Sequence, residues 1–125
     1  MGGAIYNTEG ELTIIDSALN ENTAQDDGGA MYNKDGELTI TKTTLNNNTA
    51  RENGGAICNS ASELIITSSK LNENVANFNG GAIYNNHGEL TIIESTLTEN
   101  TARDSGGAID NSGELTVSDS TLTGN

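Results

Sequence analysis

A glutamate recurs every 25 or 26 residues along the sequence, and these carboxylates are the strongest candidates for binding a ligand or a metal ion. They are Glu11, Glu37, Glu63, Glu89 and Glu114. A Leu follows each Glu, so if the Leu points inward the Glu must point outward, because side chains alternate along a strand. Carboxylate oxygens bind Ca²⁺, which makes this edge a candidate Ca²⁺ site. We favour a solvated acidic edge that limits lateral aggregation, because the calcium-type repeat GGxGxDxUx is absent.

Asparagine recurs in two further columns with nearly the same spacing. The first column is Asn7, Asn33, Asn59, Asn85 and Asn111, and the second is Asn22, Asn48, Asn74, Asn100 and Asn125. Asn tolerates left-handed backbone at a bend, and its amide can donate to one neighbour while accepting from the next. We therefore predict two structural ladders that turn corners of the chain, with no role in binding a ligand.

The single cysteine, Cys58, shares a column with Tyr6, Tyr32, Tyr84 and Asp110. The Asp indicates that this column faces solvent, so we predict a partly accessible thiol that is not a nucleophile. One cysteine cannot form a disulfide within the chain.

Other polar residues give no catalytic or cofactor-binding set. His87 is the only histidine, so no Cys–His or Ser–His–Asp arrangement repeats around it, and we predict that it is solvated. Arg51 and Arg103 have the acidic neighbours Glu52 and Asp104, which suggests two surface ion pairs of little energetic value. The recurring Gly-Gly pairs lack the following helix and the Lys of a phosphate-binding loop. We expect no enzyme activity and no cofactor.

These columns belong to a repeat that runs through the whole chain. Gly-Gly-Ala begins at residues 2, 28, 54, 80 and 106, a spacing of 26 residues each time, and the last unit lacks one residue at its first turn. The repeat divides one domain, residues 1–125, into the coils 2–27, 28–53, 54–79, 80–105 and 106–125. A single unit could not bury its apolar face, whereas a stack of three or more could.

The apolar residues within each unit indicate strands. Leu12 and Ile14 alternate with polar neighbours, as a half-buried strand requires, and Ala4–Asn7 and Ser17–Leu19 are two further short extended runs. Turn-forming residues lie between them. We predict an all-β fold, a right-handed parallel β-helix of five coils with three short strands per coil. A leucine-rich repeat has a similar period and is the alternative fold. In that fold a helix connects one strand to the next, but here the connecting segment is Gly-Gly-Ala-Ile-Tyr-Asn, which suits a strand.

The composition restricts the partners. There are 18 Asp and Glu against 5 Lys and Arg, for a net charge of −13, and no Pro or Trp. Nucleic acids and anionic membranes need basic surfaces, so we expect no binding to nucleic acid. No apolar run approaches the roughly 20 residues of a membrane helix, so we expect no membrane insertion by this segment.

Two short motifs connect the chain with known families. GGAI occurs at 2–5, 54–57, 80–83 and 106–109, and L-x-x-N occurs at 19–22, 45–48, 71–74, 97–100 and 122–125. Together they resemble the GGAI and FxxN repeats of chlamydial polymorphic outer-membrane proteins, with Leu in place of Phe. They also resemble the GGAIYN repeats of adhesin-like surface proteins of bacteria and archaea. The resemblance implies a β-helix of the pectate-lyase-like type, located extracellularly or on the cell surface.

Function is expected to follow from rigidity and repetition. The leading hypothesis is a structural or adhesive rod, a stalk or passenger segment of a cell-surface or secreted protein, with surface glycans or proteins as partners. The alternatives are a self-assembling filament subunit and a polysaccharide-binding or polysaccharide-active β-helix. Enzymes of the last kind need a cleft formed by long loops, for which strict 26-residue spacing leaves no room. Both end coils lack a cap, so we expect self-association through the ends, as a dimer or a filament.

Overall fold

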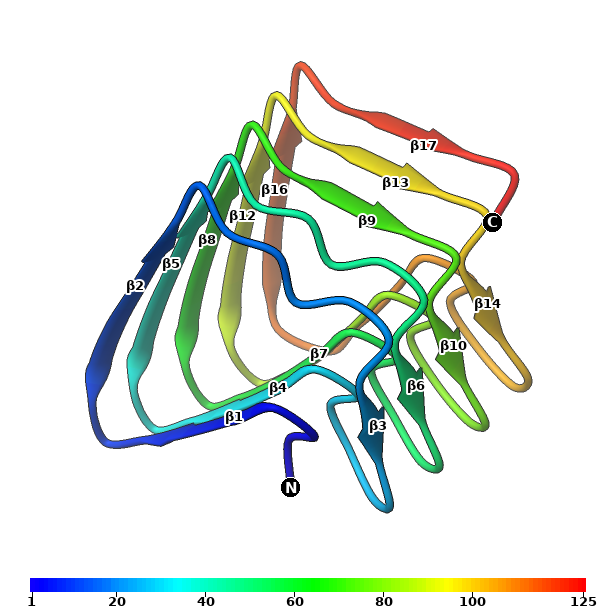
Figure 1. Ribbon diagram of the computed structural model, residues 1–125. Coiled ribbons are helices and arrows are strands. Elements are labelled where there is room, and N and C mark those ends of the chain that lie inside the picture. Colours follow the sequence, from blue (N-terminus) through cyan, green and yellow to red (C-terminus); the bar gives the residue numbers. More distant parts are fainter.

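The chain winds into a β-solenoid, and the computed structural model describes all residues, 1–125 (Figure 1). The structure contains strands and turns but no helix, and all strand pairs are parallel. Each residue pairs with its equivalent 25 or 26 positions away, as in Leu38 with Leu64. The all-β solenoid of five coils is therefore confirmed. No helix is present that could cross a membrane.

Two five-stranded sheets form the most regular walls of the solenoid. The first sheet has the order β1-β4-β7-β11-β15 and the second β16-β12-β8-β5-β2. The first sheet comprises β1 (Ile5–Thr8), β4 (Met31–Lys34), β7 (Ile57–Ser60), β11 (Ile83–Asn86) and β15 (Ile109–Asn111). The second comprises β2 (Glu11–Ile15), β5 (Glu37–Thr41), β8 (Glu63–Thr67), β12 (Glu89–Ile93) and β16 (Glu114–Ser118).

The remaining walls are shorter. The third sheet comprises β9 (Lys70–Asn72), β13 (Thr96–Thr98) and β17 (Thr121–Thr123), and single bridges from Ala18 to Thr44 and from Thr44 to Lys70 extend it through coils 1 and 2. A fourth sheet of two-residue strands comprises β3 (Thr23–Ala24), β6 (Thr49–Ala50), β10 (Val75–Ala76) and β14 (Thr101–Ala102). This fourth strand adds to the three predicted from sequence. It was not predicted because a strand of two residues is too short to show an alternating pattern of apolar and polar side chains.

Coils 2, 3 and 4 each have four corners at which a residue adopts positive φ. In coil 3 these residues are Gly54 (φ 66), Ala61 (φ 50), Ser68 (φ 49) and Glu73 (φ 54). The ladder asparagines do not adopt this conformation. Their side chains point inward, so the left-handed backbone falls on neighbouring, mostly exposed residues, and our assignment of it to the Asn columns was wrong.

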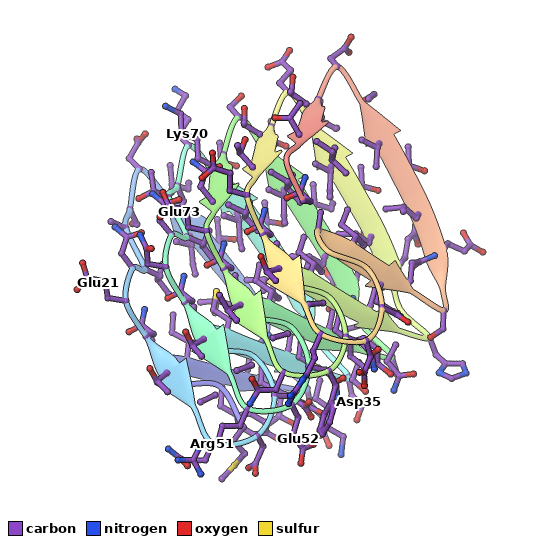
Figure 2. The ribbon with its side chains drawn as sticks, turned by 90° about the vertical axis from the view of Figure 1, so that its right-hand side faces the viewer. Glu21, Asp35, Arg51, Glu52, Lys70 and Glu73 are labelled. Atoms are coloured by element: carbon purple, nitrogen blue, oxygen red, sulfur yellow. The ribbon has the colours of Figure 1, made fainter.

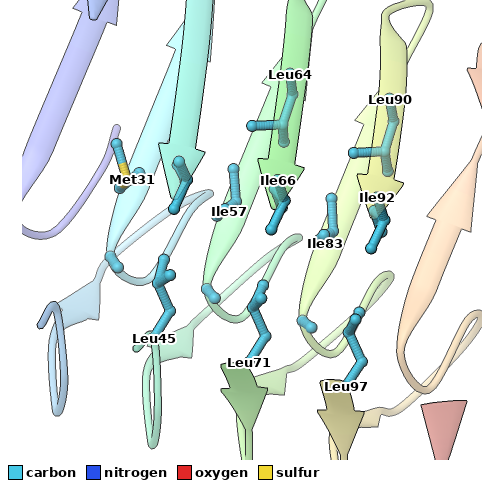
Figure 3. Packing of buried hydrophobic residues seen from close by; sticks show 14 of the residues in the cluster. Met31, Leu45, Ile57, Leu64, Ile66, Leu71, Ile83, Leu90, Ile92 and Leu97 are labelled. Carbon is cyan, nitrogen blue, oxygen red and sulfur yellow. The ribbon is translucent and has the colours of Figure 1, made fainter. Parts of the chain in front are cut away.

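The core consists of columns of identical or similar side chains (Figure 3). Leu64 packs between Leu38 and Leu90, and all three are at most 1% exposed. The other columns contain Met31, Ile57 and Ile83; Ile40, Ile66 and Ile92; and Leu45, Leu71 and Leu97. Because each side chain packs on its own copy in the next coil, a few apolar residues per coil are enough to exclude water.

The second glycine of each Gly-Gly pair permits a close approach between coils. A Cβ at Gly55 would overlap the carbonyl oxygen of Gly81 and lie 2.6 Å from the backbone nitrogen of Val75. Both obstacles are backbone atoms that cannot rotate away. Glycine is thus required where the corner leading into the first sheet packs against the next coil.

Candidate functional site

A groove of about 560 Å³ runs along the corner between the first and second sheets. Four coils line it, each through the turn that precedes the second sheet: residues 9–11, 35–37, 61–63 and 87–89. The recurring Glu side chains line one side of the groove and are exposed, as predicted. Glu9 and Asp35 add two further carboxylates, and His87 contributes the only side chain able to carry a positive charge.

Strand register sets the spacing of the Glu column. Glu37 pairs with Glu11 on one side and with Glu63 on the other, and Glu63 pairs with Glu89. Neighbouring strands lie about 4.8 Å apart, so like charges stand directly opposite one another, which is unfavourable. The groove therefore attracts cations. No group of three or more His, Cys, Asp or Glu side chains is arranged to hold a metal ion.

The first Asn ladder lies directly behind this groove. Nδ2 of Asn59 donates to the carbonyl oxygen of Ser62 and to Oδ1 of Asn85, both at 2.8 Å, and Oδ1 of Asn59 accepts from Nδ2 of Asn33 at 2.9 Å. Nδ2 of Asn33 also reaches the carbonyl oxygen of Glu63 at 3.3 Å. The ladder thus fixes the backbone that carries the Glu column.

The second ladder stabilises the corner after the third sheet. Both the backbone nitrogen and Nδ2 of Asn74 donate to Oδ1 of Asn100, at 3.0 and 2.9 Å, and Nδ2 also donates to the carbonyl oxygen of Leu45 at 2.8 Å. Asn48 makes the same contacts one coil earlier. Asn48, Asn74 and Asn100 are fully buried, so these amides replace water as hydrogen-bond partners at the corner.

A third ladder, of hydroxyl groups, was missed in the sequence. The backbone nitrogen of Ser69 donates to Oγ of Ser95 at 3.1 Å, and Oγ of Ser69 donates to the carbonyl oxygen of Thr67 at 2.8 Å. The column consists of Ser17, Thr43, Ser69, Ser95 and Ser120. Its signal in the sequence is a small hydroxyl residue at the same position of every coil.

The prediction that Cys58 is accessible was wrong. The residue is 1% exposed, and burial raises the pKa of its thiol, to which the nearby Asp27 carboxylate adds. Tyr32 and Tyr84 are its partners on the adjacent strands and flank the small thiol on both sides. The column does face outward, since Tyr32, Tyr84 and Asp110 are all half-buried, and only the short Cys58 side chain between the two tyrosines is covered.

The two arginine ion pairs are also absent. Arg51 and Arg103 are exposed and form no salt bridge, and the single ion pair joins the Met1 ammonium to Asp26 at 3.5 Å. The charged side chains labelled in Figure 2, including Arg51 and Glu52, project away from the coils. Both pairs lie in the turn that follows the fourth sheet, not on a strand. His87 is exposed, as predicted.

Comparison with known proteins supports the resemblance noted in the sequence. Residues 42–60 match the Chlamydia polymorphic membrane protein repeat. The matched segment runs from the corner before the third sheet in coil 2, through Gly54, to the end of β7 in coil 3. No curated protein and no solved structure gives a significant match. The chain is therefore a β-solenoid that resembles chlamydial polymorphic membrane protein repeats, which suggests a surface repeat protein.

Proposed function

We propose that this chain is a non-enzymatic structural or adhesive rod, a stalk or passenger segment of a cell-surface or secreted repeat protein. The observation that carries the proposal is the uninterrupted stack, in which every coil pairs with the next residue for residue. Such a stack is held by backbone ladders, a continuous apolar core and three side-chain ladders, so it resists bending. The match to polymorphic membrane protein repeats supports a location on the cell surface.

Labelling of intact cells tests the location. Antibodies raised against the purified chain should label unpermeabilised cells of the source organism, and brief protease treatment of intact cells should remove the label. An antibody to a cytoplasmic protein is the control and should bind only after permeabilisation. Labelling that requires permeabilisation in both cases would contradict the proposal.

The acidic groove favours one second candidate, binding or cleavage of a polysaccharide. Paired carboxylates about 5–5.5 Å apart serve as acid and nucleophile in retaining glycosidases, and Glu37 and Glu63 stand on adjacent strands. The purified chain should be incubated with neutral and acidic polysaccharides, with binding and reducing ends both measured. Activity that disappears in Glu63→Gln but persists in Glu73→Gln, an exposed residue outside the groove, would favour this candidate over a rod.

A further inference from the structure

Three successive asparagines, residues 46–48, form the corner between the third and fourth sheets in coil 2. Asn48 is fully buried in the second Asn ladder. Oδ1 of Asn46 accepts a hydrogen bond from the backbone nitrogen of Asn72 at 3.1 Å. Asn47, by contrast, is exposed, and its side chain makes no hydrogen bond. Asn47 is therefore the member of this run whose amide is open to modification.

The backbone at this corner directs the side chain into solvent. Asn47 has φ 55, and its backbone nitrogen donates to the carbonyl oxygen of Asn72 at 3.0 Å. The equivalent residues of coils 1, 3 and 4 are Glu21 (φ 58), Glu73 (φ 54) and Glu99 (φ 54), and all are exposed. Figure 2 shows Glu21 projecting away from the coils. A group attached to Nδ2 of Asn47 extends into solvent in the same way.

Asn47 also begins a modification motif. Asn47, Asn48 and Thr49 form the sequence Asn-x-Thr, the acceptor of N-linked glycosylation when x is not Pro. No other Asn of the chain has Ser or Thr two residues later. Thr49 is half-buried in β6, and Thr23 and Thr101 occupy the same column. The motif therefore arises from the corner residue, which is Asn in coil 2 and Glu in coils 1, 3 and 4.

We propose that Asn47 carries an N-linked glycan. The substrate is an oligosaccharide activated at its anomeric carbon by a lipid-linked phosphate or diphosphate, and the enzyme is an oligosaccharyltransferase. Nδ2 of Asn47 forms a bond to the anomeric carbon, and the bond from that carbon to the phosphate oxygen breaks. The lipid phosphate leaves with the electron pair, and Nδ2 gives up one of its two protons to a base of the transferase.

The transfer precedes stacking of the coils. The transferase reads Asn47 and Thr49 together, but in the fold Asn48 between them is held in the buried ladder. The backbone nitrogen of Thr49 donates to the carbonyl oxygen of Asn22 at 2.9 Å. These bonds join different coils, so they are absent from the unfolded chain, which is the acceptor. The fold then leaves the modified side chain outside the stack.

The glycan lies away from the acidic groove. The corner that contains Asn47 is equivalent to the one between β9 and β10, which lies across the solenoid from the corner between β1 and β2 (Figure 1). The groove follows the latter corner. A bulky, solubilising glycan at Asn47 therefore covers the surface beside the third and fourth sheets and leaves the groove accessible.

This inference rests on the proposed surface location, because N-linked glycans are attached to exported chains. Mass spectrometry of the chain recovered from its source organism tests it. Trypsin cleaves after Lys42 and Arg51 and releases residues 43–51 with the whole motif. We expect this peptide to carry a glycan that fragmentation locates on Asn47. Recovery of the unmodified peptide alone would overturn the proposal. Where antibodies label intact cells, that result would leave the proposed function standing.

Export from a eukaryotic secretory host tests the motif itself. With a signal peptide added, the secreted wild-type chain should show a mass increase that peptide N-glycosidase removes. Asn47→Gln and Thr49→Ala should abolish the increase, and Thr49→Ser should retain it. Asn77→Gln, exposed and outside the motif, is the matched control and should keep the full increase. A secreted wild-type chain without a glycan, or equal glycosylation of Asn47→Gln, would overturn the proposal.

Discussion

Asn74 donates two hydrogen bonds to a single oxygen atom of Asn100, one from its backbone nitrogen at 3.0 Å and one from Nδ2 at 2.9 Å. Both residues are fully buried. Asn100 repeats the arrangement with Asn125. The corner therefore depends on an amide that donates and accepts together, which no other side chain of similar shape can do.

Replacing Asn74 by Asp tests the ladder. Asp lacks Nδ2, so the variant leaves the carbonyl oxygen of Leu45 without this donor and brings a buried carboxylate against Oδ1 of Asn100. We expect the free energy of unfolding to fall by about 3–5 kcal/mol. Urea denaturation measures the change. Asn77→Asp is the exposed control and should change stability by less than about 0.5 kcal/mol. Equal losses in the two variants would contradict a structural ladder.

Ala61 is a site where stability can be gained. It is exposed and has φ 50, whereas Gly, Asp or Asn suits such a conformation better. We expect Ala61→Gly to raise the free energy of unfolding by about 0.5–1 kcal/mol, because the strain exceeds the entropic cost of glycine. The matched control is Ala76→Gly, at the buried position of β10, which should destabilise. A loss of stability in Ala61→Gly, measured by the same urea denaturation, would argue against this corner geometry.

The Glu column should destabilise the fold at low salt. Glu63 faces Glu37 and Glu89 on the adjacent strands. Removing its charge in Glu63→Gln should raise stability by about 0.2–1 kcal/mol, and the gain should shrink as added NaCl screens the repulsion. Thermal melts at several NaCl concentrations measure this effect.

The same variant separates repulsion from a Ca²⁺ site. If the column only repels, millimolar CaCl₂ should act on the wild-type chain and on Glu63→Gln as NaCl of equal ionic strength does. A rise in melting temperature that is specific to Ca²⁺ and is lost in Glu63→Gln would establish the column as a binding site instead.

Burial of Cys58 makes stability depend on alkaline pH. Burial raises the pKa of its thiol above the value of about 8.5 found in unfolded chains. Above pH 8.5 the unfolded state loses this proton and the folded state keeps it, so stability present at pH 7 is lost as the pH rises. We expect the melting temperature to fall more between pH 7 and 9.5 in the wild-type chain than in Cys58→Ser.

Reaction with a thiol reagent gives an independent measurement of the same burial. The native chain should react slowly at neutral pH and the unfolded chain at once. Identical pH profiles of the wild type and Cys58→Ser, together with fast reaction of the native thiol, would mean that Cys58 is exposed.

The sequence predicted the repeat, the coil number and the columns because each column recurs at a fixed position. Leu12 and Ile14 alternate within one strand, and a period of two is visible in five residues. β3, only Thr23–Ala24, is too short to show any period. The acidic groove was predicted only as an edge, since Glu9 and Asp35 line it from a turn whose path the sequence does not reveal.

Errors arose where a conclusion depended on neighbours in space. Asp110 correctly indicated a column that faces outward, but the short side chain of Cys58 is covered by Tyr32 and Tyr84 on the adjacent strands. Left-handed backbone was assigned to Asn because Asn tolerates it. The buried amides need inward-pointing side chains, so the strain falls on exposed neighbours such as Glu73.

Contacts between Leu64 and its two copies test the central claim, that coils stack in a 26-residue register, most directly. Leu38, Leu64 and Leu90 are at most 1% exposed and paired in register. Nuclear Overhauser effects between leucine methyl groups should connect Leu64 with both Leu38 and Leu90. Slowly exchanging side-chain amide protons of Asn59 and Asn74 should accompany them. Absence of these methyl contacts, or contacts joining residues at any other spacing, would contradict the account.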